Sequence, residues 1–464
     1  RDGSFSLFQD SQVRAFLAAN GLHPRSLLLL GAEDEIGARE IAIPPPPQAT
    51  EHPEGAYTLL VEPFTRPQEQ RALSVGVGRI PYALERSSRQ LLRSFARARL
   101  NALASPRALM IANPEGDLPL AELVARLTER ELRNRRVETL GLYRLPSDLE
   151  EAVRASRQSQ LIIYEGHIGG QRLFEAPPGL QFEETDSSEE AEGPAGPVET
   201  IPPPDGEAPA SLSPILAGSD TERRLDGSPV LVLQSCRSLQ DDTLRRFHDL
   251  GGAAVVGSVT KIHSASGATF VHALIHGLLE RGHTLGEALR DARNYFFLLQ
   301  DLKGKRAHTL ASKSLRVVYS FRLWGDPELR VFPRRSAPRR KGAEIDWDGT
   351  DALLLQLPAR RLASLSLKPY TAKPFPGAEL AGIVSKKQAG RSLRLLPLHY
   401  RRLQTPRGWA GLGFVALRAA GGSDSKTRCV FRLEERGRTL HLLYFPRSER
   451  AGSNHRLTFS KAAK

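Results

Sequence analysis

The sequence predicts an α/β fold, a three-layer α/β/α sheet in two subdomains, followed by a mainly β domain at the C-terminus. Between about residues 20 and 335, short apolar runs alternate with segments of helical periodicity, which is typical of a parallel sheet covered by helices. Beyond residue 336, short β-like runs lie between Gly, Pro and charged residues, a pattern that favours a β-sandwich or small barrel. The length of 464 residues allows two to four domains of roughly 100–200 residues. We therefore expect domains at 1–104, 105–335 and 336–464.

The first subdomain is predicted from three apolar runs and one amphipathic segment. The run 26–31 (SLLLLG) has the composition of a buried parallel strand, and 57–61 and 73–81 (LSVGVGRIP) are further strand candidates. A helix is expected over 87–104, where Ser87 or Ser88 serves as N-cap.

The second subdomain repeats this alternation. The expected strands are 108–112, 137–142, 160–164, 229–234 and 253–257. The expected helices are 120–133, 147–156, 240–250, 267–281 and 284–301. Two further segments, 315–323 and 328–332, flank a turn at Gly325-Asp326-Pro327.

Composition excludes several classes of protein. Hydrophobic residues make up 40% and charged residues 25%, as in a globular chain. The longest apolar runs fall far short of the roughly 20 residues that span a bilayer, so we expect a soluble protein. Two cysteines exclude a disulfide scaffold and a multi-cysteine metal site. A single methionine and an N-terminal arginine indicate a trimmed chain, and no signal peptide is visible, so the compartment, cytoplasmic or secreted, stays open.

Charge is distributed unevenly along the chain. Residues 336–464 hold 25 Lys and Arg against 9 Asp and Glu, a net of +16, within a total of +13. This basic domain predicts an anionic surface or polyanion as a partner, or alternatively an arginine-rich solvated face that keeps the domain soluble.

An acidic insert is expected at 175–227. It holds 13 acidic and 2 basic residues, and its Pro, Gly and Ser content is typical of disorder. Three roles are open: a lid across a neighbouring cleft, a processing loop cut at Arg223-Arg224, or a plain spacer.

Two polar loops follow apolar strands. Tyr164-Glu165-Gly166-His167-Ile168-Gly169-Gly170 follows one strand, and Gln234-Ser235-Cys236-Arg237-Ser238 follows the next. Carboxyl ends of parallel strands share one edge of a sheet, so His167 and Cys236 are expected there together. A cysteine and a histidine in this position can form a nucleophile and base pair for acyl transfer. Alternatively, Cys236 is a small buried apolar residue and His167 an ordinary loop residue.

These loops resemble the histidine–glycine and cysteine loops of the caspase-fold cysteine peptidase clan. Within it, LSVGVGRIP (73–81) and SLLLLGAED (26–34) are similar to segments of gingipain-like peptidases. The segment ALMIANPEGDLPLAE (108–122) is closer to bacterial caspase-like CHAT domains, and LGGAAVVGSVT (250–260) and RLWGDPELRV (322–331) are similar to both. The resemblance covers about residues 20–335 and implies a caspase-like sheet.

The resemblance implies a Cys–His dyad in a cysteine-type endopeptidase. Cys236 would be the nucleophile and His167 the general base and acid, with the backbone N–H groups of Cys236 and Ile168 as oxyanion donors. Ile168 replaces the usual glycine, and the spacing from His167 to Cys236 is lengthened by the insert. A catalytically degenerate scaffold for protein interaction is therefore a second hypothesis, and a polyanion-binding module formed by the basic domain is a third.

The remaining site residues are less constrained. Asp117 follows a strand and is a candidate to orient the imidazole of His167; alternatively, it is an ordinary turn residue. Glu165 is close to His167 in the sequence, but its side chain can point away from the imidazole. Ser258, Thr260 and Lys261 follow the next strand and are candidates for the specificity pocket. The expected partner is a protein or peptide substrate. The resemblance implies no organic cofactor and leaves a structural calcium open.

Three motifs are rejected as functional signals. His272 and His276 have zinc-ligand spacing on a helix but lack the glutamate of the metallopeptidase motif, so a structural helix face is favoured. The pair Gly76 and Gly78 has no further glycine to complete a dinucleotide-binding loop, and Cys429 lies in an alternating strand pattern typical of a core position. No metal site is predicted.

Overall fold

The computed structural model describes part of the chain. The described ranges are 15–32, 39–43, 57–61, 75–113, 118–143, 149–167, 225–303, 317–332, 345–348, 352–356, 364–365, 393–394, 399–406, 418–421, 428–434, 439–445 and 454–460, together with residue 36, apart from short gaps such as 240–246 and single positions such as 237, 261 and 263.

The central feature is a mixed sheet in which eight described strands follow the order β1-β4-β10-β9-β8-β7-β5-β6. Their bounds are β1 (Ser26–Leu30), β4 (Gly76–Ile80), β5 (Arg107–Ala112), β6 (Glu138–Tyr143), β7 (Leu161–Glu165), β8 (Val230–Gln234), β9 (Ala254–Ser258) and β10 (Phe321–Trp324). Strands from both predicted subdomains thus join in one sheet.

Strand direction divides the sheet into two groups. Strands β5 to β9 are all parallel to one another. Strand β10 is antiparallel to β9, whereas β4 is parallel to β10 and β1 to β4. The carboxyl ends of β5, β7, β8 and β9 therefore lie along one edge of the sheet, and those of β1 and β4 lie along the opposite edge.

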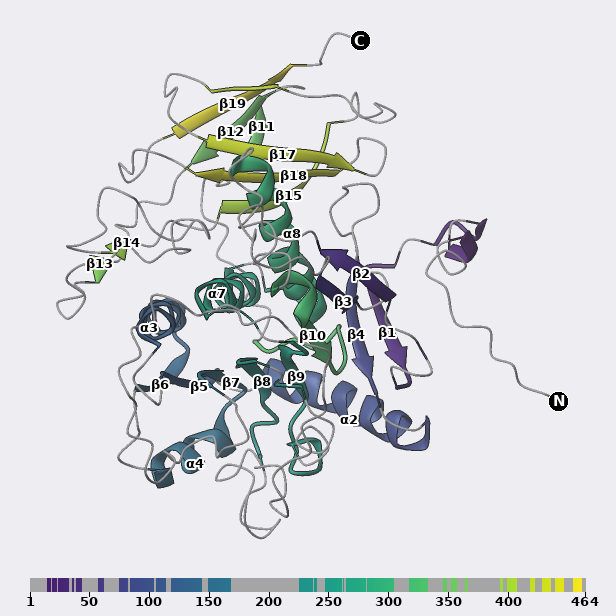
Figure 1. Ribbon diagram of the computed structural model, residues 1–464, viewed down its shortest axis with the longest axis vertical. Helices are drawn as coiled ribbons and strands as arrows, with labels where there is room; N and C mark the ends of the chain where they lie inside the picture. The colour runs from purple at the N-terminus through teal and green to yellow at the C-terminus, as the bar shows by residue number, and fades with distance from the viewer. Residues whose placement is uncertain are drawn as a thin grey trace.

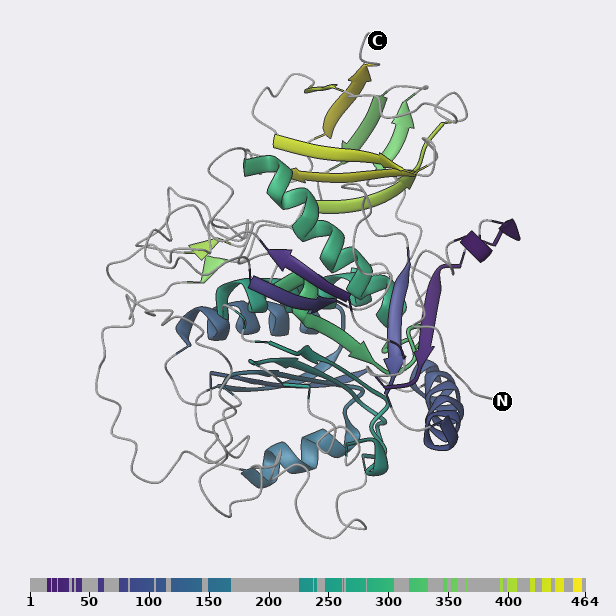
Figure 2. The same ribbon diagram turned by 45° about the vertical axis from the view of Figure 1, so that its right-hand side comes forward.

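Helices cover both faces of the sheet (Figure 1). Helices α3 (Pro119–Asn134), α7 (Ser264–Glu280) and α8 (Leu285–Lys303) lie on one face, and α2 (Leu84–Leu103) and α4 (Leu149–Gln158) lie on the other (Figure 2). Alternate residues of the strands enter two separate cores: Ile163 and Val232 face α7, whereas Ile162 and Leu231 face the opposite side. The α/β class is confirmed.

Burial on both faces explains the strand sequences. Every residue of β7 (LIIYE), β8 (VLVLQ) and β9 (AVVGS) is buried. A strand covered on both sides needs apolar residues at successive positions rather than alternate ones. The continuous apolar runs therefore predicted these strands correctly.

The prediction of a buried strand at 26–31 was wrong in one respect. Strand β1 is parallel, as expected, but it lies at the edge of the sheet and pairs only with β4. Residues Ser26 to Leu28 are half-buried and Leu30 is exposed, because none of the described strands lies on the outer side of β1. A leucine run does not distinguish an edge strand from a central one.

Several other elements differ from the prediction, either in their bounds or by an additional strand. Helix α2 begins at Leu84 rather than at Ser87. The predicted strand 57–61 is β3 (Tyr57–Val61), and it pairs with an unpredicted strand β2 (Arg39–Ile43) in a separate antiparallel hairpin. Residues 317–320 form a helical turn before β10, and of the predicted helix 240–250 only 247–249 are described as helical.

Close packing explains the glycines of β4. A Cβ added to Gly76 would contact the backbone carbonyl carbon of Gly286 at 2.5 Å, and one added to Gly78 would contact the backbone oxygen of Gly325. These glycines allow α8 and the turn after β10 to approach the sheet, which is a structural role and not a dinucleotide site.

The C-terminal part consists of antiparallel strands. Four strands form the sheet β11-β12-β19-β16, three form β15-β18-β17, and β13 pairs with β14. Their bounds are β11 (Ile345–Asp348), β12 (Ala352–Gln356), β13 (Ser364–Leu365), β14 (Leu393–Arg394), β15 (His399–Gln404), β16 (Arg418–Gly421), β17 (Arg428–Glu434), β18 (Thr439–Phe445) and β19 (Asn454–Ser460). Helix α8 contacts β17 and β18 (Figure 1), so the mainly β part packs on the end of a core helix. Among the described helices, none has the length and apolarity that crossing a bilayer requires.

Candidate functional site

The two predicted loops leave neighbouring strands in register. Strand β7 pairs with β8 so that Glu165 lies opposite Gln234, and the ladder continues because the N–H of Gly166 donates to the carbonyl of Gln234 at 3.2 Å. His167 and Cys236 each lie two residues beyond that registered pair. Adjacent strands are about 5 Å apart, so the two loops that carry these residues begin side by side at the same edge.

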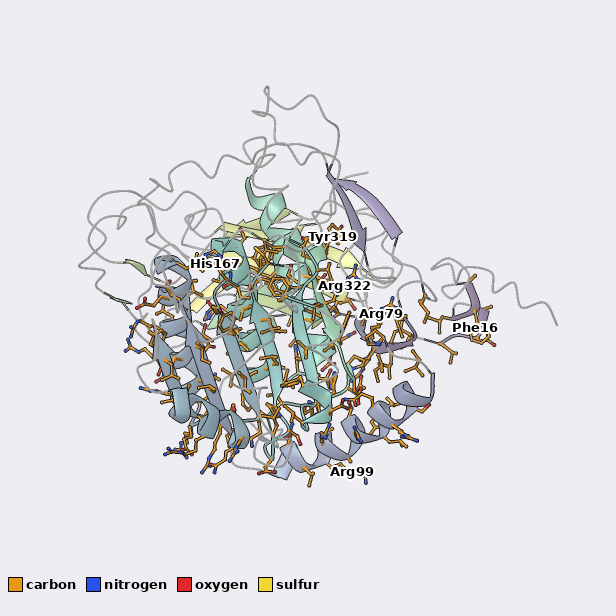
Figure 3. The ribbon with its side chains drawn as sticks, turned by 60° about the horizontal axis from the view of Figure 1, so that its bottom comes forward. Phe16, Arg79, Arg99, His167, Tyr319 and Arg322 are labelled. Atoms are coloured by element: carbon orange, nitrogen blue, oxygen red, sulfur yellow. The ribbon has the colours of Figure 1, made fainter. Side chains whose placement is uncertain are left out.

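His167 is exposed at the end of β7 (Figure 3). The hydroxyl of Tyr164 donates to the carbonyl oxygen of His167 at 2.8 Å. This bond fixes the backbone of the loop directly at the histidine. Sequence reasoning missed Tyr164, because an aromatic residue inside an apolar strand gave no sign that its hydroxyl would reach the loop.

Cys236 is half-buried, and its sulfur contacts the segment that precedes α7. The N–H of Ile262 donates to Sγ at 3.4 Å, and the thiol donates back to the carbonyl of Ile262 at 3.6 Å. Helix α7 begins two residues later, at Ser264. The positive end of the helix dipole therefore lies near the sulfur.

Ser238 ties the cysteine loop to the end of β9. Its hydroxyl accepts the N–H of Ser258 at 2.9 Å and donates to the carbonyl of Leu233 at 3.4 Å. The N–H of Leu239 also donates to the carbonyl of Ser258 at 3.1 Å. The loop that carries Cys236 is thus braced from the neighbouring strand, a role of the second serine of the SCRS motif that sequence reasoning missed.

A third loop follows β5 at the same edge. Asn113 is buried in a left-handed conformation, φ 51°, and its N–H donates to the carbonyl of Glu165 at 2.7 Å. Its side chain accepts the N–H of Leu118 at 2.6 Å and donates to Glu122 at 2.9 Å. Asp117 itself lies outside the described residues, between Asn113 and Leu118, which are bonded to each other at this edge.

Glu165 is buried directly behind the two loops. It is 0% exposed, and among the described residues neither carboxyl oxygen has a hydrogen-bond partner. Burial raises the pKa of this carboxyl well above its usual range and so favours its neutral, protonated form. Strand alternation places its side chain on the α7 side of the sheet, with Ile163 and with Gln234 of β8.

The candidates for the specificity pocket lie at the end of β9 and directly after it. Ser258 is fully buried, and its hydroxyl donates to the carbonyl of Thr260 at 2.7 Å. Thr260 is half-buried, and its hydroxyl is 2.5 Å from that of Ser320. Lys261 and Ile168 lie outside the described residues, so the predicted pocket and the predicted oxyanion donor at Ile168 stay predictions.

The rejected zinc motif forms a contact between helices. The Nδ1 of His276 is 2.7 Å from a carboxyl oxygen of Glu131 on α3, and the Nε2 of His272 is 3.6 Å from the other oxygen. The Nδ1 of His272 is 2.9 Å from the hydroxyl of Thr128. Within the described ranges, no three His, Cys, Asp or Glu side chains are arranged to hold a metal ion.

No family model and no curated protein matches the sequence. Among solved structures, the chain is similar to the arginine-specific cysteine proteinase gingipain R, with a TM-score of 0.43 and 10% identity over 95% of this chain and 82% of that one. It is also similar to the complex of the pro- and mature domains of RgpB from Porphyromonas gingivalis, with a TM-score of 0.42 and 11% identity over 97% and 83% of the two chains. Separase of Saccharomyces cerevisiae, in its complex with securin, aligns with a TM-score of 0.33 and 13% identity over 54% of this chain and 14% of that one.

Proposed function

We propose that the chain is a cysteine-type endopeptidase of the caspase-fold clan, gingipain-like with features of CHAT domains. The observation that carries the proposal is the register of β7 and β8, which brings the His167 and Cys236 loops to the same edge of the sheet. The two loops and the five further segments that resemble those of the clan, in their order along the chain, support the same assignment. Residues 1–104 and 105–335 would be the two subdomains of the peptidase, and 336–464 a separate basic domain.

In the proposed mechanism, His167 takes the proton of the Cys236 thiol and the sulfur attacks the carbonyl carbon of the scissile peptide bond. The tetrahedral intermediate collapses when His167 gives the proton to the leaving amine, so the C–N bond breaks and a thioester remains. His167 then takes a proton from water, the resulting hydroxide attacks the thioester, and the acid product leaves as the thiol reforms.

Backbone N–H groups would stabilise the oxyanion. The proposed donors are the N–H of Cys236 and the N–H of Ile168, which would point at the developing negative charge. The hydrogen bonds that brace both loops support this, because an oxyanion hole needs donors held in place before the reaction begins: Tyr164 to the carbonyl of His167, and Ser238 to Ser258.

A third group would orient the imidazole. Asp117 is the proposed residue, because its loop follows β5, the neighbour of β7, and is anchored by Asn113 at the same edge. Glu165 is a weaker choice, because a neutral carboxyl does not stabilise an imidazolium ion. The loop after β9, with Ser258, Thr260 and Lys261, would form the side of the cleft that binds the substrate side chain.

One observation favours the degenerate scaffold as a second function. The described partners of the Cys236 sulfur are the backbone N–H and carbonyl of Ile262, which hold the thiol against the segment before α7. A peptidase must release this thiol toward His167, whereas an interaction scaffold need not.

The charge of the basic domain supports polyanion binding as an additional function. Retention of the full chain on heparin tests this function, with a basic protein of the size of lysozyme as the control.

The decisive experiment is cleavage of a synthetic peptide library by the full chain and its variants. Cys236→Ala and His167→Ala should each abolish cleavage without unfolding the chain, and the double variant should be no worse than either single one because the two residues act as a unit. Cys429→Ala is the matched control and should keep full activity. Full activity of Cys236→Ala would exclude the mechanism, and inactivity of the parent chain toward the whole library would favour the scaffold.

A further inference from the structure

Helix α2 presents an outer face that combines apolar and basic side chains. Leu92 is 69% exposed, Phe95 48% and Leu100 61%. Arg89, Arg93 and Arg99 are exposed as well. At 100° per residue these six positions fall within one continuous stripe of the helix. Figure 3 shows Arg99 on the side of α2 that faces away from the sheet.

The opposite side of α2 is the one that packs on the protein. Ser94 and Asn101 are buried, and Asn101 donates to the carbonyl of Ser228 at 3.4 Å. Arg97 donates to the carbonyl of Gly252 at 2.9 Å, and the side chain of Gln90 is 2.6 Å from His248. The helix is therefore held firmly by its inner side, and its outer apolar residues are not needed for that packing.

The charges of the outer face are all positive. Between Ser88 and Leu100 the sequence contains no Asp or Glu and four arginines, of which Arg97 lies on the inner side and the other three on the outer face. An isolated exposed leucine needs no explanation, but three large apolar side chains among arginines on one stripe indicate a binding surface. Its occupant must be acidic and carry apolar side chains of its own.

The chain contains such a segment. Residues 175–222 hold twelve Asp and Glu and no Lys or Arg. Two short stretches within them, 179–182 (GLQF) and 212–216 (LSPIL), carry leucine, isoleucine and phenylalanine. The composition complements the α2 face in both charge and apolar content.

The chain returns from this segment beside α2. Residue Leu225, where the described chain resumes, donates its N–H to the carbonyl of Leu250 at 2.8 Å, and its own carbonyl oxygen lies 3.0 Å from a Cβ placed on Gly251. The next residue, Gly252, is the one that accepts from Arg97 of α2. Residues 212–222 are thus tethered within a few residues of the helix, which raises their effective concentration at its outer face.

We propose that the acidic segment 175–222 docks on the outer face of α2, with its apolar side chains against Leu92, Phe95 and Leu100 and its carboxylates against the arginines. The docking is intramolecular and does not depend on the peptidase activity. It uses a surface on the side of the sheet away from α3 and α7, and it leaves the basic C-terminal domain free for another ligand.

A photo-crosslinking experiment on the full chain tests the proposal. With p-benzoylphenylalanine in place of Phe95, irradiation in low salt should attach the probe to peptides within 175–222 of the same chain, independently of protein concentration. Two control variants carry the same probe at other exposed positions and should not capture the segment. One has it in place of Phe16 on the N-terminal segment, and the other in place of Gln404 on β15 of the basic domain. Raising the salt to about 0.5 M should reduce capture at position 95 by about fivefold or more, because exposed charges are then screened over a few ångströms.

Charge reversal separates docking from mere proximity. With the probe at position 95, Arg93→Glu together with Arg99→Glu should reduce capture at least as strongly as salt does. Arg130→Glu together with Arg136→Glu, exposed residues outside α2, is the matched control and should leave capture unchanged. Capture of the segment at Gln404 instead of Phe95 would overturn the proposal in favour of the basic domain. Concentration-dependent capture between chains would overturn it as well. So would capture that is unaffected by the Arg93 and Arg99 changes while phosphatidylglycerol vesicles bind the full chain through those arginines.

Discussion

Replacing Glu165 by glutamine should stabilise the protein increasingly as the pH rises. Glu165 is 0% exposed, and among the described residues its oxygens have no hydrogen-bond partner, so burial favours the protonated form and raises its pKa well above the usual value of 4.5. Glutamine has nearly the same volume and cannot ionise. Glu165→Gln therefore removes the cost of keeping a proton on the carboxyl while leaving the packing intact.

The magnitude follows from proton linkage. Above pH 4.5 the unfolded chain has released the Glu165 proton, whereas the folded chain keeps it until the raised folded pKa is reached. The folded state then binds one more proton than the unfolded state, so stability of the parent chain falls by about 1.4 kcal/mol per pH unit through this group alone. The variant lacks this loss. The nearby Tyr143 does not interfere, because burial, the hydrogen bond to Glu129 and the charge of Glu129 raise its pKa, so it remains neutral throughout this range.

Urea unfolding followed by circular dichroism at pH 5, 6, 7 and 8 measures the effect. The difference in free energy of unfolding between Glu165→Gln and the parent should grow in favour of the variant, at the slope given above, until the pH reaches the raised pKa of the folded state. Glu138→Gln is the control: its side chain is 73% exposed in a surface ion pair with Arg107, and its removal should shift stability by a few tenths of a kcal/mol. Parallel curves for Glu165→Gln and the parent would refute the assignment of a buried neutral carboxyl.

Three further predictions follow from described contacts. Burial alone would raise the pKa of Glu131, but the charge and hydrogen bond of His276, with smaller contributions from its other charged neighbours, lower it from 4.5 to about 2. Glu131→Gln should therefore cost at most about 3 kcal/mol near pH 7, and the difference from the parent should vanish as the pH falls from 4.5 through 2, measured by urea unfolding. Gly76→Ala should lower the free energy of unfolding by roughly 1–3 kcal/mol, because its methyl would meet the backbone of Gly286, and an unchanged unfolding midpoint would contradict that packing. Tyr164→Phe should cost about 1 kcal/mol and lower kcat more than it changes KM, because His167 loses a backbone anchor; an unchanged kcat would limit Tyr164 to a structural role.

Local signals predicted most of the sheet and the position of the candidate site. The apolar runs of β7, β8 and β9 are strands because both sides of the sheet are covered, and that burial can be read from sequence alone. The prediction that the His167 and Cys236 loops share an edge needed only the assumption that their strands are parallel. The pairing of β7 with β8 is parallel, as assumed.

Non-local contacts could not be predicted in the same way. The insertion of β10 between β9 and β4, antiparallel to one and parallel to the other, depends on packing between segments far apart in the chain. The same holds for the hydroxyl of Ser238, whose partner Ser258 is twenty residues away. The edge position of β1 escaped prediction because its leucines have the same composition as those of a central strand.

The central claim is that Cys236 is a nucleophile activated by His167. Mass spectrometry of the full chain treated with a peptidyl acyloxymethyl ketone tests it most directly, with iodoacetamide as a reagent that needs no active site. We predict one ketone adduct per chain, located on Cys236, retained in Cys429→Ala and slowed by about 100-fold or more in His167→Ala, since a positioned general base contributes factors of that size. Equal labelling of the parent and His167→Ala, or an adduct on Cys429 instead of Cys236, would contradict the claim.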